Sequence, residues 1–195
     1  MTDVPVRGDV VAALRAGAVV LLPTDTVYGL AVATAVPSAV AQLFGLKERG
    51  RDVPIAVLVA DAAQAWELAA APVPGAASRL AATWWPGPLT LVVARAPGWG
   101  GDIGGRGDTV GVRCPDDAMV RELCRQVGPL ATTSANRHGE PTPATAAEAA
   151  VAVGHSGLVV DGGRLAGAPS TVVDCTVSPP RVLREGALPA AGLVA

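Results

Sequence analysis

The sequence has little lysine, cysteine or aromatic content. Among its 195 residues, Lys47 is the only lysine, there are three cysteines, and the aromatic residues are four tryptophans, one tyrosine and one phenylalanine. Three cysteines without a C-x-x-C pair argue against a disulfide framework and are typical of a reducing compartment. We therefore expect a cytoplasmic protein with an aliphatic core, in which the cysteines are small core residues.

Excess charge and membrane-spanning segments are also missing. The 15 basic and 17 acidic residues give a formal net charge of −2, so no global basic field favours nucleic acid or anionic lipid. Charged residues precede the first apolar run, which is the wrong layout for a signal peptide. The uncharged stretch between Asp25 and Lys47 contains Pro37 and Gln42, and it predicts a loop, a short strand and a helix rather than a membrane span.

Common nucleotide and metal motifs are absent from the sequence. Lys47 is followed by Glu48, so no G-x-x-x-x-G-K-[ST] loop exists. The glycine-rich segment 98–107 does not spell G-x-G-x-x-G and is either a surface loop or a lid. His138 and His155 lack metal-ligand spacing, and no G-x-S-x-G elbow occurs, so we expect no metal ligand set and no catalytic triad.

Apolar runs alternate with helical patterns along the chain. This alternation predicts an α/β fold in which an open sheet with some antiparallel pairs is covered by helices on both faces. Besides the short strand before Pro37, the expected strands are 19–22, 55–59, 89–94, 109–113, 130–133, 158–161, 171–176 and 182–184. The expected helices are one around 10–14, one from Pro37 to Leu46, one over 62–69 capped by Asp61, one over 76–83, one capped by Asp116 and ending near Gly128, and one after the Thr145/Glu148 capping box. We expect one domain spanning 1–195, with a core of about 8–186 and a short tail.

Polar residues gather where the expected strands end, which is where open α/β sheets bind ligands. The groups are Pro23–Leu30, Lys47–Arg51, Arg113, Thr132–Asn136, and Ser170–Thr171 with Arg184. Each group alone could be a turn or a helix cap, and Lys47 could simply balance a helix dipole. Arg113 ends an apolar strand, so its charge must emerge at the sheet edge or find a buried partner. Taken together, the groups predict one polar, cationic cleft.

Seven motifs carry a resemblance to a known family. They are PTDTVYGL at 23–30, K-x-R at 47–49, WPGPLT at 85–90, TVGVRCP at 109–115, TSAN at 133–136, STVVD at 170–174 and R-x-G at 184–186. In this order they resemble the YrdC-like family over nearly the whole chain. The resemblance implies a twisted open mixed α/β sheet with a concave, positively charged cleft. It also implies L-threonylcarbamoyladenylate synthase activity.

The resemblance further implies roles for individual residues. The residues expected to bind L-threonine are Thr26, Tyr28, Arg113, Thr132 and Ser170. Those expected to bind ATP are Arg49, Thr109, Ser134, Asn136, Thr142 and Arg184. Lys47 and Arg49 are the expected catalytic residues. Val53 and Leu58 depart from residues common in relatives, where a polar residue and a histidine occur.

The implied reaction converts ATP, L-threonine and bicarbonate to threonylcarbamoyl-AMP and pyrophosphate, with Mg²⁺ accompanying ATP. Expected partners are the small substrates, transient contact with the tRNA threonylcarbamoyl-transferase complex, and weak RNA binding, without membrane association. Two alternatives remain open from the sequence. One is a double-stranded RNA-binding module, and the other is a carbamoyl-transfer domain of the hydrogenase-maturation type.

Overall fold

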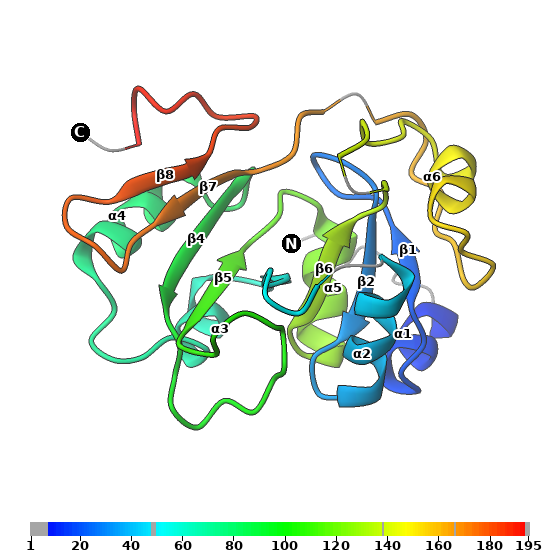
Figure 1. The fold of residues 1–195 in the computed structure, drawn as a ribbon, viewed down its shortest axis with the longest axis horizontal. Coiled ribbons are helices and arrows are strands. Elements are labelled where there is room, and N and C mark those ends of the chain that lie inside the picture. The colour runs from blue at the N-terminus through cyan, green and yellow to red at the C-terminus, as the bar shows by residue number, and fades with distance from the viewer. Residues whose placement is uncertain (1–7, 48–49, 138, 166, 194–195) are drawn as a thin grey trace.

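The described residues form one eight-stranded sheet in the order β1-β2-β6-β3-β5-β4-β7-β8 (Figure 1). The structure is a computed structural model that describes residues 8–47, 50–137, 139–165 and 167–193. The strands are β1 (Val20–Leu22), β2 (Gly29–Ala33), β3 (Ala56–Leu58), β4 (Leu89–Ala94), β5 (Thr109–Arg113), β6 (Leu130–Ser134), β7 (Thr171–Asp174) and β8 (Arg181–Arg184). The pairs β3–β5 and β4–β7 are parallel and the other neighbours are antiparallel, so the predicted mixed sheet is confirmed.

Helices pack on both faces of this sheet. They are α1 (Gly8–Arg15), α2 (Pro37–Leu46), α3 (Ala62–Glu67), α4 (Gly75–Trp84), α5 (Ala118–Val127) and α6 (Ala146–Ala152). Successive residues of a strand point to opposite faces, and the two cores follow this alternation. Leu30 and Val32 of β2 join the core that includes α2, α4 and α6, whereas Ala31 and Ala33 join the core that includes α1 and α5. Burial on both faces explains the unbroken apolar character of β2.

The core under α1 and α5 covers only one half of its face of the sheet. Among the described residues, that core takes strand side chains from β1, β2, β3 and β6 and none from β4, β5, β7 or β8. On the same face of the uncovered strands lie Thr90 on β4 and Gly111 and Arg113 on β5, together with small apolar residues such as Val92. The uncovered half is therefore the part of the sheet that remains open to a ligand.

Two local predictions are wrong. The N-cap of α5 is Asp117, whose carboxylate accepts from Val120 N at 2.9 Å, and Asp116 pairs instead with Arg121 at 3.2 Å. The segment 158–161 is not a strand and makes only an isolated bridge between Leu21 and Val159. Glycines with positive φ lie on both sides of the segment, Gly154 at 63° and Gly163 at 79°, and such backbone interrupts an extended strand.

Other local predictions are confirmed. Asp61 caps α3 by accepting from Gln64 N at 2.9 Å, and Thr145 with Glu148 forms the capping box of α6. The three cysteines are buried and form no disulfide, as expected for small core residues. Burial raises the pKa of Cys114 and of Cys175 to about 11. Within the described residues, no helix has the length and apolar character needed to cross a membrane.

Candidate active site

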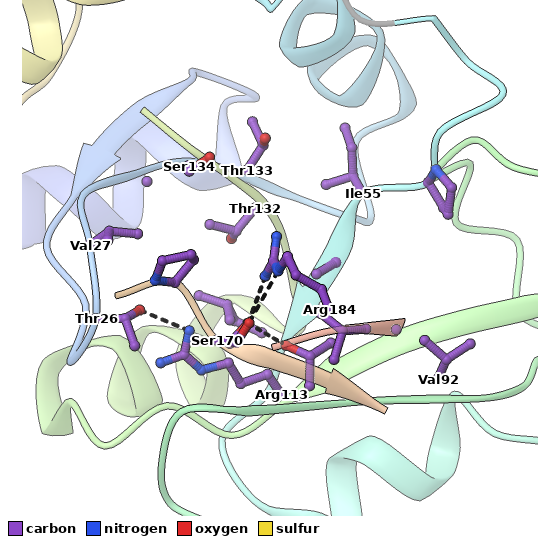
Figure 2. A pocket seen from close by; sticks show the side chains of 18 of the residues that line it. Thr26, Val27, Ile55, Val92, Arg113, Thr132, Thr133, Ser134, Ser170 and Arg184 are labelled. Carbon is purple, nitrogen blue, oxygen red and sulfur yellow. Dashed lines mark hydrogen bonds between the residues drawn. The ribbon is translucent and has the colours of Figure 1, made fainter. Parts of the chain in front are cut away.

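A cavity of about 320 Å³ lies on the uncovered half of the sheet (Figure 2). Its walls come from the turn after β1, from the segment before β3, from the faces of β4, β5 and β6, and from the last two strands. The sequence-predicted residues that line it are Thr26, Thr109, Arg113, Thr132, Ser134, Ser170 and Arg184. The structure thus brings together seven predicted residues from segments far apart in the sequence.

The strand alternation explains which side chains reach the cavity. On β5, Val110 and Val112 are buried in the core on the opposite face, so Thr109, Gly111 and Arg113 face the cavity. Gly111 has no side chain, and a Cβ there would lie 3.5 Å from Thr90 Cγ2. Because Gly111 has no side chain, the cavity extends down to the backbone of β5 between Thr109 and Arg113.

Arg113 is buried and held by three groups. Its Nε donates to the Gly87 carbonyl oxygen at 3.1 Å, its Nη1 to Thr26 Oγ1 at 3.0 Å, and its Nη2 to Asp25 Oδ1 at 2.6 Å. Burial lowers the pKa of Arg113, and the Asp25 carboxylate opposes that shift. The expectation of a buried partner for Arg113 is therefore confirmed, and the partner is Asp25.

Arg184 is the second guanidinium of the cavity. It donates from Nη2 to the Ser170 carbonyl oxygen at 2.8 Å and to Ser170 Oγ at 3.3 Å, while Ser170 Oγ lies 2.8 Å from Thr90 Oγ1. Figure 2 shows Arg113 and Arg184 on either side of Ser170. Burial lowers the pKa of Arg184, and repulsion from Arg113 adds to the effect. In the part of the chain that the structure describes, Arg113 is paired with the Asp25 carboxylate and no carboxylate is paired with Arg184.

Lys47 lies beside the cavity at the C-cap of α2. Its Nζ donates to the Ser134 carbonyl oxygen at 2.9 Å, to the Asn136 carbonyl oxygen, and to Asn136 Oδ1 at 3.2 Å. Ser134 Oγ in turn donates to Asn136 Oδ1 at 2.6 Å. Lys47 and Asn136 are therefore joined to the cavity wall through Ser134, although neither side chain lines it.

Besides Lys47 and Asn136, two predicted site residues do not line the cavity. Tyr28 is fully buried, and its hydroxyl donates to the Gly163 carbonyl oxygen at 2.7 Å and accepts from Gly162 N. Thr142 lies half-buried before α6 and does not line the cavity. Arg49 lies outside the described residues.

The glycine-rich segment 98–107 packs against the segment before β3 and does not line the cavity. The Ile103 carbonyl oxygen accepts from Ile55 N at 2.9 Å, and Gly105 N donates to the Arg51 carbonyl oxygen at 2.7 Å. Asp102 also pairs with Arg51 at 2.5 Å. In this structure the segment supports a wall of the cavity. That wall includes Val53, one of the two departures noted in the sequence.

Several lining or supporting residues were not assigned a role from the sequence. They are Thr24, Asp25, Thr90, Val92, Val172 and Leu183. The signal for Thr90 was present, because Leu89, Leu91 and Val93 alternate with Thr90 and Val92 in the same way as the residues of β5 alternate. Reading both strands at a period of two would have placed Thr90 and Val92 on the same face as Arg113.

These observations define an open mixed sheet with a cavity lined by two guanidinium groups and several hydroxyls. The chain belongs to the Sua5/YciO/YrdC family, whose model, described as "Telomere recombination", matches residues 12–186. The putative threonylcarbamoyl-AMP synthase of Mycobacterium tuberculosis H37Rv is 43% identical over 183 residues, covering 90% of this chain and 82% of the relative.

Solved structures agree with the family. Pyrococcus abyssi Sua5 complexed with L-threonine superposes with a TM-score of 0.86 at 37% identity, over 94% of this chain and 54% of that one. Full-length HypF in its phosphate- and nucleotide-bound form superposes with a TM-score of 0.76 at 21% identity, over 92% of this chain and 28% of that one. The likeness to HypF shows the fold alone, so it does not favour the hydrogenase-maturation alternative.

Proposed function

We propose that this chain is a nucleotidyltransferase that makes threonylcarbamoyl-AMP and pyrophosphate from L-threonine, bicarbonate and ATP. Relatives of this name match most of the chain. The observation that carries the proposal is that Arg113 and Arg184 line one cavity, while among the described residues only Arg113 is paired with a carboxylate. A cavity with this surplus of positive charge suits several anionic reactants held at once.

L-Threonine would occupy the end of the cavity formed by Thr26, Arg113, Thr132 and Ser170. Arg113 offers a guanidinium to the substrate carboxylate, and the hydroxyls offer partners for the amine and the side-chain hydroxyl. Tyr28 would act indirectly, because its hydroxyl holds the backbone of Gly162 and Gly163 rather than facing the cavity.

ATP would occupy the end formed by Thr109, Ser134 and Arg184. Arg184 would neutralise phosphate oxygens, while Asn136 and Thr142 would contribute from the rim. Arg49 is proposed to bind ATP as well, because of its position in the K-x-R motif. Mg²⁺ would enter with ATP as part of that substrate. No cluster of metal-binding side chains is found among the described residues, and the nearby Asp25 carboxylate is engaged by Arg113.

The chemistry requires positioning and charge neutralisation rather than a protein nucleophile. The threonine amine adds to CO₂ derived from bicarbonate, forming an N–C bond and losing one proton. A carbamate oxygen then attacks the α-phosphorus of ATP, and the bond from that phosphorus to the bridging oxygen breaks and releases pyrophosphate. Lys47 and Arg49 are the proposed catalytic residues, with Lys47 held beside the cavity by the Ser134–Asn136 turn.

The product is a reactive anhydride that another enzyme must consume. We propose that it passes to the tRNA threonylcarbamoyl-transferase complex through transient contact, with only weak RNA binding by this chain. The net charge of −2 supports small ligands over RNA as the principal partners. A cytoplasmic location and a single domain with a core of about 8–186 complete the proposal.

Mass spectrometry of the products tests the proposed function. The purified protein with ATP, L-threonine and bicarbonate should yield threonylcarbamoyl-AMP and an equal amount of pyrophosphate, without tRNA. Omitting either L-threonine or bicarbonate should abolish pyrophosphate release, and this omission serves as the control. A requirement for tRNA, or pyrophosphate release without L-threonine, would contradict the proposal.

A further inference from the structure

The turn after β1 contains two residues that support the cavity without an assigned role, Thr24 and Asp25. The Asp25 side chain is 12% exposed and does not line the cavity, whereas its neighbours Thr24 and Thr26 do. Its carboxylate accepts from Arg113 Nη2 at 2.6 Å. Asp25 therefore acts on the cavity through Arg113 and not by touching a ligand itself.

The hydrogen bonds of Thr24 fix the direction of the Thr26 hydroxyl. Thr24 has one hydroxyl proton, and its 2.7 Å contact with the Val27 carbonyl oxygen requires that proton, because a carbonyl can only accept. Thr24 Oγ1 accepts from Thr26 N and Val27 N at 3.2 Å each, and its contact with Thr26 Oγ1 is shorter, at 3.0 Å. Because the Thr24 proton is used by Val27, a hydrogen bond between the two hydroxyls is donated by Thr26. Thr26 also accepts from Arg113 Nη1 at 3.0 Å. The Thr26 hydroxyl can thus offer a ligand only an acceptor.

The hydrogen bonds of Arg113 leave it as a donor toward the same ligand. A guanidinium has five N–H groups, and three of those on Arg113 are taken by Gly87, Thr26 and Asp25. Within the described residues the other two have no protein acceptor, and Arg113 lines the cavity. Thr26 therefore offers an acceptor to the cavity, and Arg113, which also lines it, has N–H groups left to donate.

We propose that Thr24 and Asp25 are positioning residues that set this polarity, so that an α-amino acid binds with its N–H toward Thr26 and its carboxylate toward Arg113. This inference rests on the proposed function and specifies how the amino acid is oriented in its site. One N–H of the amine survives carbamate formation, so the contact with Thr26 persists when the nitrogen acquires its new bond to carbon. The same acceptor holds the substrate before and after that step.

Thr24→Val and Thr24→Ser test the role of the hydroxyl. Valine keeps the shape of threonine but frees the Thr26 proton, so KM for L-threonine should rise at least about tenfold while KM for ATP stays unchanged. Serine keeps the hydroxyl and should restore most of the lost affinity. An unchanged KM for L-threonine in Thr24→Val, or an equal rise in both KM values, would overturn the role of Thr24.

A double-mutant cycle tests the role of Asp25. Asp25→Asn should raise KM for L-threonine about tenfold in the native background and have little effect once Arg113 is replaced by methionine. Glu122→Gln removes the carboxylate of an exposed arginine pair and is the matched control. Additive effects of the two substitutions would overturn the role of Asp25. If Asp25→Asn alone fails to fold because a buried guanidinium loses its counter-charge, the Thr24 variants decide the proposal.

The native enzyme separates this inference from the proposed function. Native protein that forms no threonylcarbamoyl-AMP would contradict the function itself. Native protein that is active, with Thr24→Val and Asp25→Asn both retaining native KM for L-threonine, would contradict only the positioning roles. Binding of L-threonine alone, measured by calorimetry, provides a second readout that does not depend on turnover.

Discussion

Lys47 Nζ and the Ser134 carbonyl oxygen are joined by a 2.9 Å hydrogen bond between the end of α2 and the end of β6. The same ammonium also bonds Asn136 Oδ1 at 3.2 Å, so one nitrogen satisfies acceptors in several directions. Such a contact suits a compact ammonium better than a planar guanidinium. The only lysine of the chain therefore connects the K-x-R motif to the TSAN motif.

Replacing Lys47 with arginine should damage catalysis more than stability. The guanidinium keeps the charge but cannot direct its donors from one atom, so Lys47→Arg should shift reacting groups by about an ångström and lower kcat about a hundredfold. The measurement is kcat with all substrates saturating, together with the thermal midpoint. If Lys47 only balanced the dipole of α2, arginine would serve equally well, and native kcat would reject the catalytic assignment.

Replacing Gly186 with alanine should disturb Ser170. A Cβ at position 186 would lie 2.1 Å from the Pro169 carbonyl oxygen and 2.7 Å from the Ser170 carbonyl carbon. The segment carrying Ser170 must move, so Gly186→Ala should cost about 1–3 kcal/mol of unfolding free energy and reduce activity. Gly192→Ala is the matched control, since nothing lies within 4 Å of its Cβ. Equal denaturation midpoints for the two variants would contradict the packing argument.

The cysteines should be dispensable for the chemistry. Cys114, Cys124 and Cys175 are all buried, and burial raises the pKa of each thiol, so little thiolate forms at neutral pH. A triple alanine variant should keep native activity per folded molecule, even with a lower thermal midpoint. The assay is the specific activity of fractions whose circular dichroism matches the native protein. A large loss of activity there would instead indicate a thiolate in the mechanism.

The same thiols should make stability fall in alkali. Burial holds the pKa of Cys114 and Cys175 at about 11 in the folded state, above their ordinary value near 9.0. The stabilisation that each protonated thiol gives the folded protein is complete below pH 9.0 and is lost as pH rises through about 11. Between these pH values the free energy of unfolding falls by about 1.4 kcal/mol per pH unit for each thiol. Urea unfolding of native and triple alanine protein between pH 8 and pH 11 measures the difference. Parallel pH curves for the two proteins would show that the thiols contribute nothing.

Sequence reasoning succeeded where the signal was local. Capping side chains located the starts of α3 and α6, and runs rich in apolar residues located β4 and β5. The α5 cap was misplaced by one residue because Asp116 and Asp117 are adjacent and both can cap. The segment 158–161 has the apolar character of a strand, but pairing along it is limited to one bridge with β1.

The site could be predicted only in part, because its partners are distant in the sequence. Arg113 required a counter-charge on physical grounds, but nothing local identified Asp25 as that group. The order of strands in the sheet, which brings the two together, depends on long-range pairing. The family resemblance implied that Tyr28 binds L-threonine, yet its side chain packs in the core on the opposite face and its hydroxyl donates to the Gly163 carbonyl oxygen.

The position of Arg184 on the outermost strand has a consequence during protein synthesis. Thr26 follows the first strand of the sheet, and Arg184 ends the last strand, yet both line one cavity. A ribosome delivers the turn that holds Arg113 well before the strand that carries Arg184. A nascent chain can therefore assemble the part of the cavity around Thr26 and Arg113 before the strand that carries Arg184 has been made.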